Sequence, residues 1–193
     1  PYGSLSDYKN SDYWRDFSNI IEEEAPAGTS LIVTLTQMGT LEDYIIKKAV
    51  DVNNVTELII SGPLNLQDLS QIGTMVRLQK LNMLDSSFEN GRFYYDFNQN
   101  SGLPFLKELI LPKELKALDG SFNYLRRLEK VVLPKSIEEL FTVFQGCEAL
   151  HDINLTECEN LKRIGVGCFS GCTSLPSTLI LPKSIRTIDD CAF

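Results

Sequence analysis

The sequence predicts a solenoid, in which short repeats stack side by side and each repeat buries its apolar face only against its neighbours. One observation is a repeated phrase: L-K-E-L-I-L-P at 106–112 returns as L-E-K-V-V-L-P at 128–134 and as L-H-D-I-N-L-T at 150–156, and L-I-L-P recurs at 179–182. A second observation is the constant interval of 22 residues between the leucines that open the first three phrases. A third is the alternation of apolar and polar residues within each phrase, which is typical of a half-buried strand.

The composition supports a folded domain and argues against two classes of partner. The chain has 193 residues, of which 43% are hydrophobic, so it can bury a substantial core. Its formal net charge is -8 and its 18 basic residues are scattered, which argues against binding to nucleic acid. No apolar run approaches the roughly 18 residues of a membrane-spanning helix, so we expect no membrane insertion of this segment. No signal peptide is recognisable, and because the chain opens at Pro1 we expect it to be a piece of a longer protein.

The residues that precede the repeats predict short, separate elements. Residues 1–24 are aromatic and helix-like, and the Ala-Pro-Ala-Gly sequence at 25–28 ends them. Residues 31–35 are rich in β-formers and predict a strand. Thr40 is placed to N-cap a helix over 41–49, in which apolar residues recur at helical spacing.

The repeats predict one strand each, beginning near residues 55, 78, 106, 128, 150 and 178. The longest interval contains an inserted loop, Phe88–Ser101, which is rich in Asn, Gly and Tyr. Three repeats place a phenylalanine six residues before the next opening leucine, at Phe122, Phe144 and Phe169. Since equivalent positions of stacked repeats lie one above another, we expect these rings to form an aromatic column inside the coil.

Alternation along the strands predicts which side chains face the core and which face outward. One outward column carries charges of alternating sign, which in neighbouring strands favour each other by roughly 0.2–1 kcal/mol per pair. Its members are Glu57, Lys80, Glu108, Lys130, Asp152 and Thr178. The second outward column is mainly aliphatic and comprises Ile59, Asn82, Ile110, Val132, Asn154 and Ile180. The charged column has a purely structural interpretation, in which it keeps the coils in register, whereas an apolar stripe on an exposed sheet usually marks a contact surface.

The sequence offers no pattern that is typical of catalysis or of metal binding. His151 is the only histidine, and Asp152 next to it points to the opposite face of the strand, so we predict no catalytic residues and no enzyme activity. We find no phosphate-binding glycine loop and no Cys or His cluster at zinc spacing, and we predict no cofactor and no metal. Cys147 and Cys172 share the repeat position of Leu125. A disulfide between them is geometrically allowed, but we favour burial as small apolar residues.

The repeats resemble the BspA-like leucine-rich repeats, a spirochaete-type class of about 23 residues in surface proteins of anaerobic bacteria. The motif of that class, roughly L-x-x-I-x-I-P-x-S-V-x-x-I-G-x-x-A-F-x-G-C-x-x-L, is matched by residues 128–150 and 150–175, and again by 179–193. The resemblance implies an α/β leucine-rich repeat solenoid. Such a solenoid would have a curved parallel sheet on the concave face, a mostly irregular or short-helical convex side, and short helices near the N-terminus.

The same resemblance implies how the chain is organised. Residues 1–24 are similar to the tail that closes a repeat array, and residues 25–54 to an N-terminal capping strand and helix. Residues 55–193 would then be the solenoid itself. On this interpretation the chain starts at the end of one array and enters a second.

In function, the resemblance implies a non-enzymatic cell-surface or secreted module for binding or adhesion, whose partner is a host or bacterial surface protein or a glycan. We expect the site on the concave sheet and in the inserted loop, at Glu108, Ile110, Lys130, Val132, Asp152, Asn154, Ile180, Phe93, Tyr94 and Tyr95. The loop aromatics suit recognition because they offer a large contact area, but they equally suit packing of the loop onto the coil. The alternative function is a structural spacer or oligomerisation element that self-associates through an open C-terminal repeat.

Overall fold

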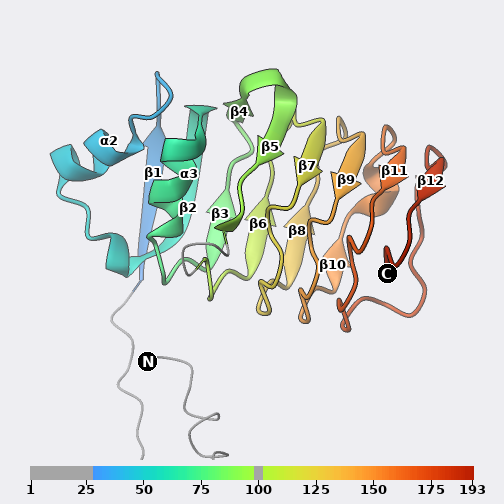
Figure 1. The fold of residues 1–193 in the computed structure, drawn as a ribbon. Coiled ribbons are helices and arrows are strands. Elements are labelled where there is room, and N and C mark those ends of the chain that lie inside the picture. Colours follow the sequence, from blue (N-terminus) through green and yellow to red (C-terminus); the bar gives the residue numbers. More distant parts are fainter. Residues whose placement is uncertain (1–27, 98–101) are drawn as a thin grey trace, which may run out of the picture.

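The chain winds into a stack of coils that runs from strand β1 at one end to strand β12 at the other (Figure 1). This computed structural model describes residues 28–97 and 102–193. The predicted helix-like segment over 1–24 and residues 98–101 of the inserted loop lie outside the described residues. Within the described part, the prediction of a solenoid built on parallel strands is confirmed.

The N-terminal part is close to the sequence prediction. Strand β1 (Thr29–Thr34) pairs in parallel with β2 (Val55–Leu64), and helix α2 (Leu41–Lys48) lies between them in the chain. The predicted strand over 31–35 and helix over 41–49 are therefore confirmed to within two residues. A short 3₁₀ turn (Val52–Asn54) leads into β2, and a second helix, α3 (Leu66–Gly73), was not predicted.

A first parallel sheet runs through most of the stack in the order β1-β2-β3-β6-β8-β10, with β4 paired to the far end of β2. Its shorter strands are β3 (Lys80–Asn82), β4 (Ser86–Phe88), β6 (Glu108–Ile110), β8 (Lys130–Val132) and β10 (Asp152–Ile153). Five of the six predicted repeat strands are thus confirmed. The strand predicted near residue 178 does not form. A 3₁₀ turn (Leu155–Glu157) follows β10, which has only two residues. The next coil therefore finds few backbone groups with which to form a further strand.

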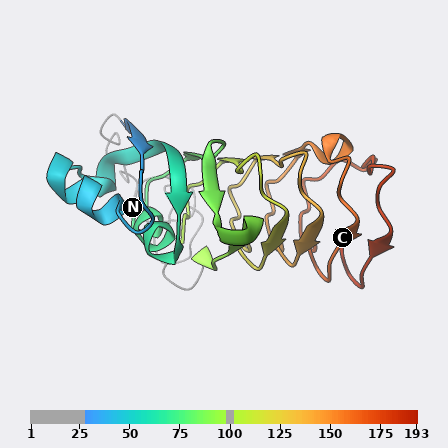
Figure 2. The same ribbon diagram turned by 90° about the horizontal axis from the view of Figure 1, so that it is seen from above.

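A second parallel sheet lies on another side of the coils, above the first sheet in Figure 1, and Figure 2 shows the stack from above. Its order is β12-β11-β9-β7-β5. Its strands are β5 (Arg92–Tyr94), β7 (Ala117–Asp119), β9 (Glu139–Phe141), β11 (Arg163–Ile164) and β12 (Thr187–Ile188). We expected the convex side to be mostly irregular or short-helical, but it is more regular, because short alternating phrases such as E-E-L and R-T-I stack as strands too.

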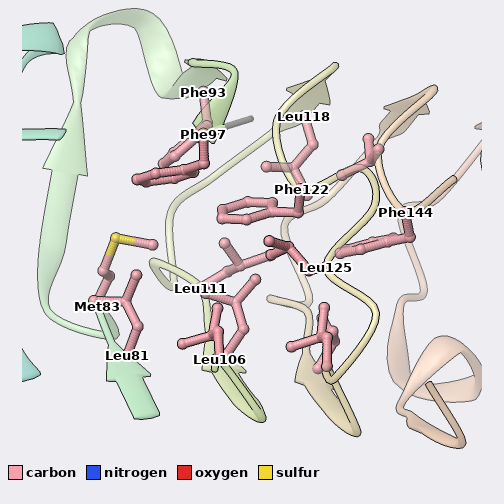
Figure 3. Close-up of a cluster of buried hydrophobic side chains, with 14 of the residues drawn as sticks. Leu81, Met83, Phe93, Phe97, Leu106, Leu111, Leu118, Phe122, Leu125 and Phe144 are labelled. Carbon is pink, nitrogen blue, oxygen red and sulfur yellow. The ribbon is translucent and has the colours of Figure 1, made fainter. Parts of the chain in front are cut away.

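The interior is filled by apolar side chains from both sheets. Leu81 and Leu106 on the side of the first sheet and Leu118 on the side of the second are all fully buried and point into the same core (Figure 3). Apolar burial of this kind contributes roughly 25 cal/mol per Å² and is the main favourable term in folding. Because no coil has a core of its own, the apolar side chains of each coil are covered by those of the next.

The predicted aromatic column inside the coils is confirmed and is longer than predicted. Ring centroids of Phe122 and Phe144 lie 6.2 Å apart, and those of Phe144 and Phe169 lie 5.7 Å apart. Phe97 extends the column at 5.5 Å from Phe122, and Phe193 extends it at 5.3 Å from Phe169. All four pairs are stacked, which is a favourable arrangement for aromatic rings at this spacing.

The buried carboxylate of Asp68 joins the two helices of the N-terminal part. Its Oδ2 accepts hydrogen bonds from the backbone N–H groups of Gly39 at 2.7 Å and of Asn65 at 3.0 Å, and its Oδ1 accepts one from Leu41 at 3.0 Å. The prediction that Thr40 caps α2 with its side chain is wrong, because its hydroxyl donates instead to a backbone carbonyl that precedes the helix. Asp68, which lies in α3, takes over the capping role from across the fold.

We predict that Asp68→Asn lowers the free energy of unfolding by about 1.5–3 kcal/mol, since the amide nitrogen would meet a backbone donor and hydrogen bonds to a charged acceptor are strong. Urea unfolding followed by circular dichroism measures this change. The matched control is Asp43→Asn on the exposed side of α2, for which we expect a change within about 0.5 kcal/mol. Equal effects of the two substitutions would contradict the capping role.

Candidate functional site

The charged column on the outer face of the first sheet is built as the sequence predicts, from residues paired in register. Glu57 pairs with Lys80, Lys80 with Glu108, Glu108 with Lys130, and Lys130 with Asp152. The ammonium of Lys80 lies 3.7 Å from Glu57 and 3.3 Å from Glu108, and that of Lys130 lies 3.0 Å from Asp152. The hydrogen bond and the charge of Asp152 raise the pKa of Lys130.

These ion pairs decide what the column can do. They are partly exposed, so each contributes little to stability and is weakened by salt. Because the charges are satisfied by one another, they offer a partner little net attraction. The structure therefore favours the register-keeping interpretation for Glu108, Lys130 and Asp152. Thr178, the last predicted member, lies outside any strand.

The aliphatic column lies beside the charged one on the same outer face. Ile59 pairs with Asn82, Asn82 with Ile110, and Ile110 with Val132. Ile32 of β1 pairs with Ile59 and extends the column by one strand. Sequence reasoning missed Ile32, although the alternation of T-S-L-I-V-T could have revealed it. We name Ile32, Ile59, Ile110, Val132 and Ile180 the outer stripe.

The members of the outer stripe differ in exposure. Ile32 and Ile180 are each 66% exposed, whereas Ile59, Ile110 and Val132 are half-buried by their neighbours. Asn82 and Asn154 interrupt the aliphatic column, and the side chain of each forms hydrogen bonds with the backbone. Asn154 Oδ1 accepts from Leu133 N–H at 2.8 Å and its Nδ2 donates to Leu133 O at 3.0 Å, so this predicted binding residue closes the end of the ladder.

The inserted loop separates into buried and exposed aromatics. Phe93 is 1% exposed and contacts the rings of Phe88, at 4.8 Å between centroids, and of Phe122, at 5.2 Å. Tyr95 is half-buried against Phe97, edge to face. For these residues the packing interpretation applies. Tyr94 alone among the three predicted binding aromatics projects outward, with 70% of its surface exposed.

Tyr94 belongs to the second sheet and so lies on a different side of the coil from the outer stripe (Figure 1). The sequence prediction combined the sheet and the loop into one site, and the structure separates them. Tyr94 borders a groove of about 250 Å³ in which Met38, Leu66 and Tyr94 are exposed apolar side chains. Arg92 and Glu89, whose side chains carry charges of opposite sign, also line this groove.

Four of the five cysteines are buried, and Cys191 is exposed. The structure has Cys147 and Cys172 as free, buried thiols, and each donates to a carbonyl of the preceding coil, at 3.2 Å to Phe122 O and 3.0 Å to Phe144 O. Burial raises the pKa of Cys168 to about 12 and that of Cys172 to about 11. Thiols held in the protonated form are poor nucleophiles and poor metal ligands. No cluster of three or more potential metal ligands occurs in residues 28–97 and 102–193.

The single histidine lies on the surface. His151 is exposed, and its Nδ1 lies 3.0 Å from the backbone oxygen of Ala149. In the part of the chain that the structure describes, no helix is long and apolar enough to cross a membrane.

Comparison with known families identifies the repeats. The family model described as BspA type leucine rich repeat region matches residues 78–193 in six copies, which is more than half of the chain. No curated protein matches the sequence.

We predict that Lys80→Glu lowers the free energy of unfolding by roughly 0.5–2 kcal/mol, because it places like charges beside both Glu57 and Glu108. The loss should shrink in 1 M NaCl, where the screening length falls to about 3 Å. Thermal unfolding at low and high salt measures both effects. Lys135→Glu, the same change at an exposed turn, is the control, and a loss that does not respond to salt would contradict the electrostatic cause.

We predict that the buried thiols make the protein less stable as the pH rises above about 9. The unfolded chain loses thiol protons near its ordinary pKa of 9.0, whereas folded Cys168 keeps its proton until about 12. The unfolded state therefore binds fewer protons, and the stabilisation is complete below pH 9 and falls above it. Urea unfolding of reduced protein at pH 8 and at pH 10 measures this. Cys168→Ala should show a shallower fall, and an identical fall in both proteins would contradict the assignment.

Proposed function

Because the chain belongs to the BspA-type leucine-rich repeat family, we propose that it is a non-enzymatic binding module that recognises a surface protein or a glycan. Membership of a leucine-rich repeat family indicates an interaction or surface module, and such repeats are generally not enzymes. We propose further that the module acts at the cell surface or in the secreted state, in adhesion to a host or bacterial partner.

The outer stripe is the observation that carries this proposal. It brings outward-facing aliphatic side chains of β1, β2, β6 and β8 into one line, which burial in the core does not require. Ile32 is exposed and Ile59, Ile110 and Val132 are half-buried, whereas the exposed Ile180 follows them in the sequence but lies outside any strand. The neighbouring charges are paired with each other, so attraction to a partner would come mainly from the apolar line. An interface of this kind gains its affinity from apolar contacts at its centre, with polar groups at its rim.

A second candidate function, a spacer or oligomerisation element, is favoured by the surface of the last described coil. Phe193 and Ile188 are exposed there, and a mainly apolar hollow of about 340 Å³ lies between Phe169, Leu179 and Phe193. A second solenoid end could cover this surface, as one coil covers the next within the stack. Such an assembly must weaken on dilution, so sedimentation at several concentrations separates it from the first candidate.

We predict that Ile110→Ser, Val132→Ser and Ile180→Ser, combined in one variant, weaken binding to an arrayed surface protein or glycan by at least about tenfold, since each removes apolar contact area worth roughly 1 kcal/mol or more. Binding of the purified chain to an array of extracellular-matrix proteins and glycans identifies the ligand, and titration of that ligand measures the change.

The control changes three exposed aliphatic residues away from the outer stripe to serine as well: Ile46→Ser, Leu84→Ser and Val166→Ser. Circular dichroism and thermal unfolding of both variants establish that each is folded. Equal binding by the stripe variant and the unchanged protein would overturn the proposed surface. Equal losses in the stripe and control variants would overturn it as well.

A further inference from the structure

A hollow with both polar and apolar lining residues lies beside the start of the inserted loop, apart from the outer stripe. It has a volume of about 410 Å³ and lies between the start of the insertion and the turn of the following coil. Its lining consists of Ser86, Ser87, Phe88, Asn90, Gly91, Pro112, Glu114, Leu115 and Lys116. The volume is within the range of about 300–1,000 Å³ that is typical of small-molecule sites.

The cause of the hollow is a mismatch in length between two neighbouring segments. Two backbone hydrogen bonds join them, from Lys113 N–H to Leu84 O at 3.1 Å and from Lys116 N–H to Gly91 O at 2.8 Å. Between these bonds one segment has residues 85–90 and the other only residues 114–115. The longer segment must arch outward, and the space beneath the arch is the hollow.

The backbone of the arch is exposed to this space. Strand β4 pairs with β2 along one edge, and no strand among the described residues pairs with its other edge. Asn90 and Gly91 turn the chain back with φ angles of 60° and 63°, a left-handed conformation that Gly and Asn tolerate best. One edge of β4 next to the hollow thus has no strand partner among the described residues.

A comparison with later coils shows that Glu114 is a local exception. The turn P-K-E-L at 112–115 corresponds to P-K-S-I at 134–137 and at 182–185. In the first of these later turns the hydroxyl of Ser136 lies 2.8 Å from Lys113 O and 2.7 Å from Leu115 O and ties the turn to the coil before it. Ser184 makes the same contact at 2.7 Å to Leu161 O. At Glu114 the preceding coil has arched away, and a carboxylate lines the hollow instead.

We propose that this hollow binds an uncharged sugar residue. Ser87, Asn90, Glu114 and Lys116 are among its lining residues. Their side chains carry hydroxyl, amide, carboxylate and ammonium groups, which can together donate and accept several hydrogen bonds. One acidic and one basic group in the same lining balance each other and favour a ligand with no net charge. Phe88 and Pro112 provide apolar walls for the C–H face of a sugar ring.

The two hydrogen bonds at the ends of the hollow favour a single sugar residue over an extended peptide as the ligand. The two hydrogen bonds that bound the hollow are three residues apart along the second segment. That segment turns at Lys113 and Glu114, so the bonds lie closer together than the roughly 10 Å that three extended residues would span. A peptide that paired with β4 would have to run past these bonds, whereas a single sugar residue fits between them. The inference rests on the proposed binding function and adds a separate site to it.

The experiment titrates the ¹⁵N-labelled chain with D-glucose, D-galactose, D-mannose and N-acetyl-D-glucosamine, with L-alanine as a zwitterionic comparison, and follows the backbone amide resonances. We expect at least one sugar to shift the amides of residues 86–91 and 113–116 in a saturable way. Glu114→Ser should lower the affinity for that sugar by about tenfold or more, as expected for loss of a charged hydrogen-bond acceptor. Serine is the residue of the equivalent later turns, so this variant should fold.

Two further variants complete the test. Asn90→Gly keeps the left-handed backbone conformation while it removes the side-chain amide, and it should also lower the affinity for the sugar. Glu159→Ser, the same change at an exposed turn away from the hollow, should leave the titration unchanged. No sugar response, a response to alanine alone, or an unaltered titration in Glu114→Ser would overturn the inference. The outer-stripe variant should keep the sugar response, so a failure of the stripe proposal and a failure of this one give different results.

Discussion

Equivalent positions of successive coils must lie on top of one another, and the other features of this structure depend on that constraint. The stacked rings from Phe97 through Phe122, Phe144 and Phe169 to Phe193 are its clearest expression, because each ring is covered by the next coil. A slip of one residue in either sheet would turn apolar side chains outward, so the column and the two ladders hold each other in register. In the N-terminal part, which precedes the regular repeats, the buried carboxylate of Asp68 holds neighbouring segments together instead.

The same constraint explains where the molecule can vary. The coil that contains the insertion returns to register through backbone bonds at Leu84 and Gly91, so the extra residues can arch outward without disturbing the core. Long insertions at the surface carry a small entropic cost compared with the loss of a buried contact. The arch therefore creates a hollow on an otherwise regular scaffold, and it does so with residues that the later coils lack.

Two kinds of outward side chain share the first sheet, and they have different physical roles. The charged column from Glu57 to Asp152 pairs with itself, which favours correct register more than it favours a partner. In the outer stripe, by contrast, neighbouring residues leave most of the side-chain surface of Ile32 and Ile180 exposed. Tyr94 presents a third surface on another side of the coil, so a partner that contacts both the stripe and Tyr94 would have to wrap around the stack.

The sequence by itself determined the repeat length, five strands of the first sheet, the aromatic column and the order of the outward columns from β2 to β10. These follow from period and alternation, because a repeat can bury its apolar face in only one way. Sequence reasoning did not predict the second sheet or the position of α3, because it assigned a single strand to each repeat. Only the tertiary structure decided that Phe93 is buried and Tyr94 exposed, that Asn154 bonds to the backbone of Leu133, and that Glu114 lines a hollow. Each of these depends on which segment of a neighbouring coil lies opposite, and an insertion in one coil changes that for the next.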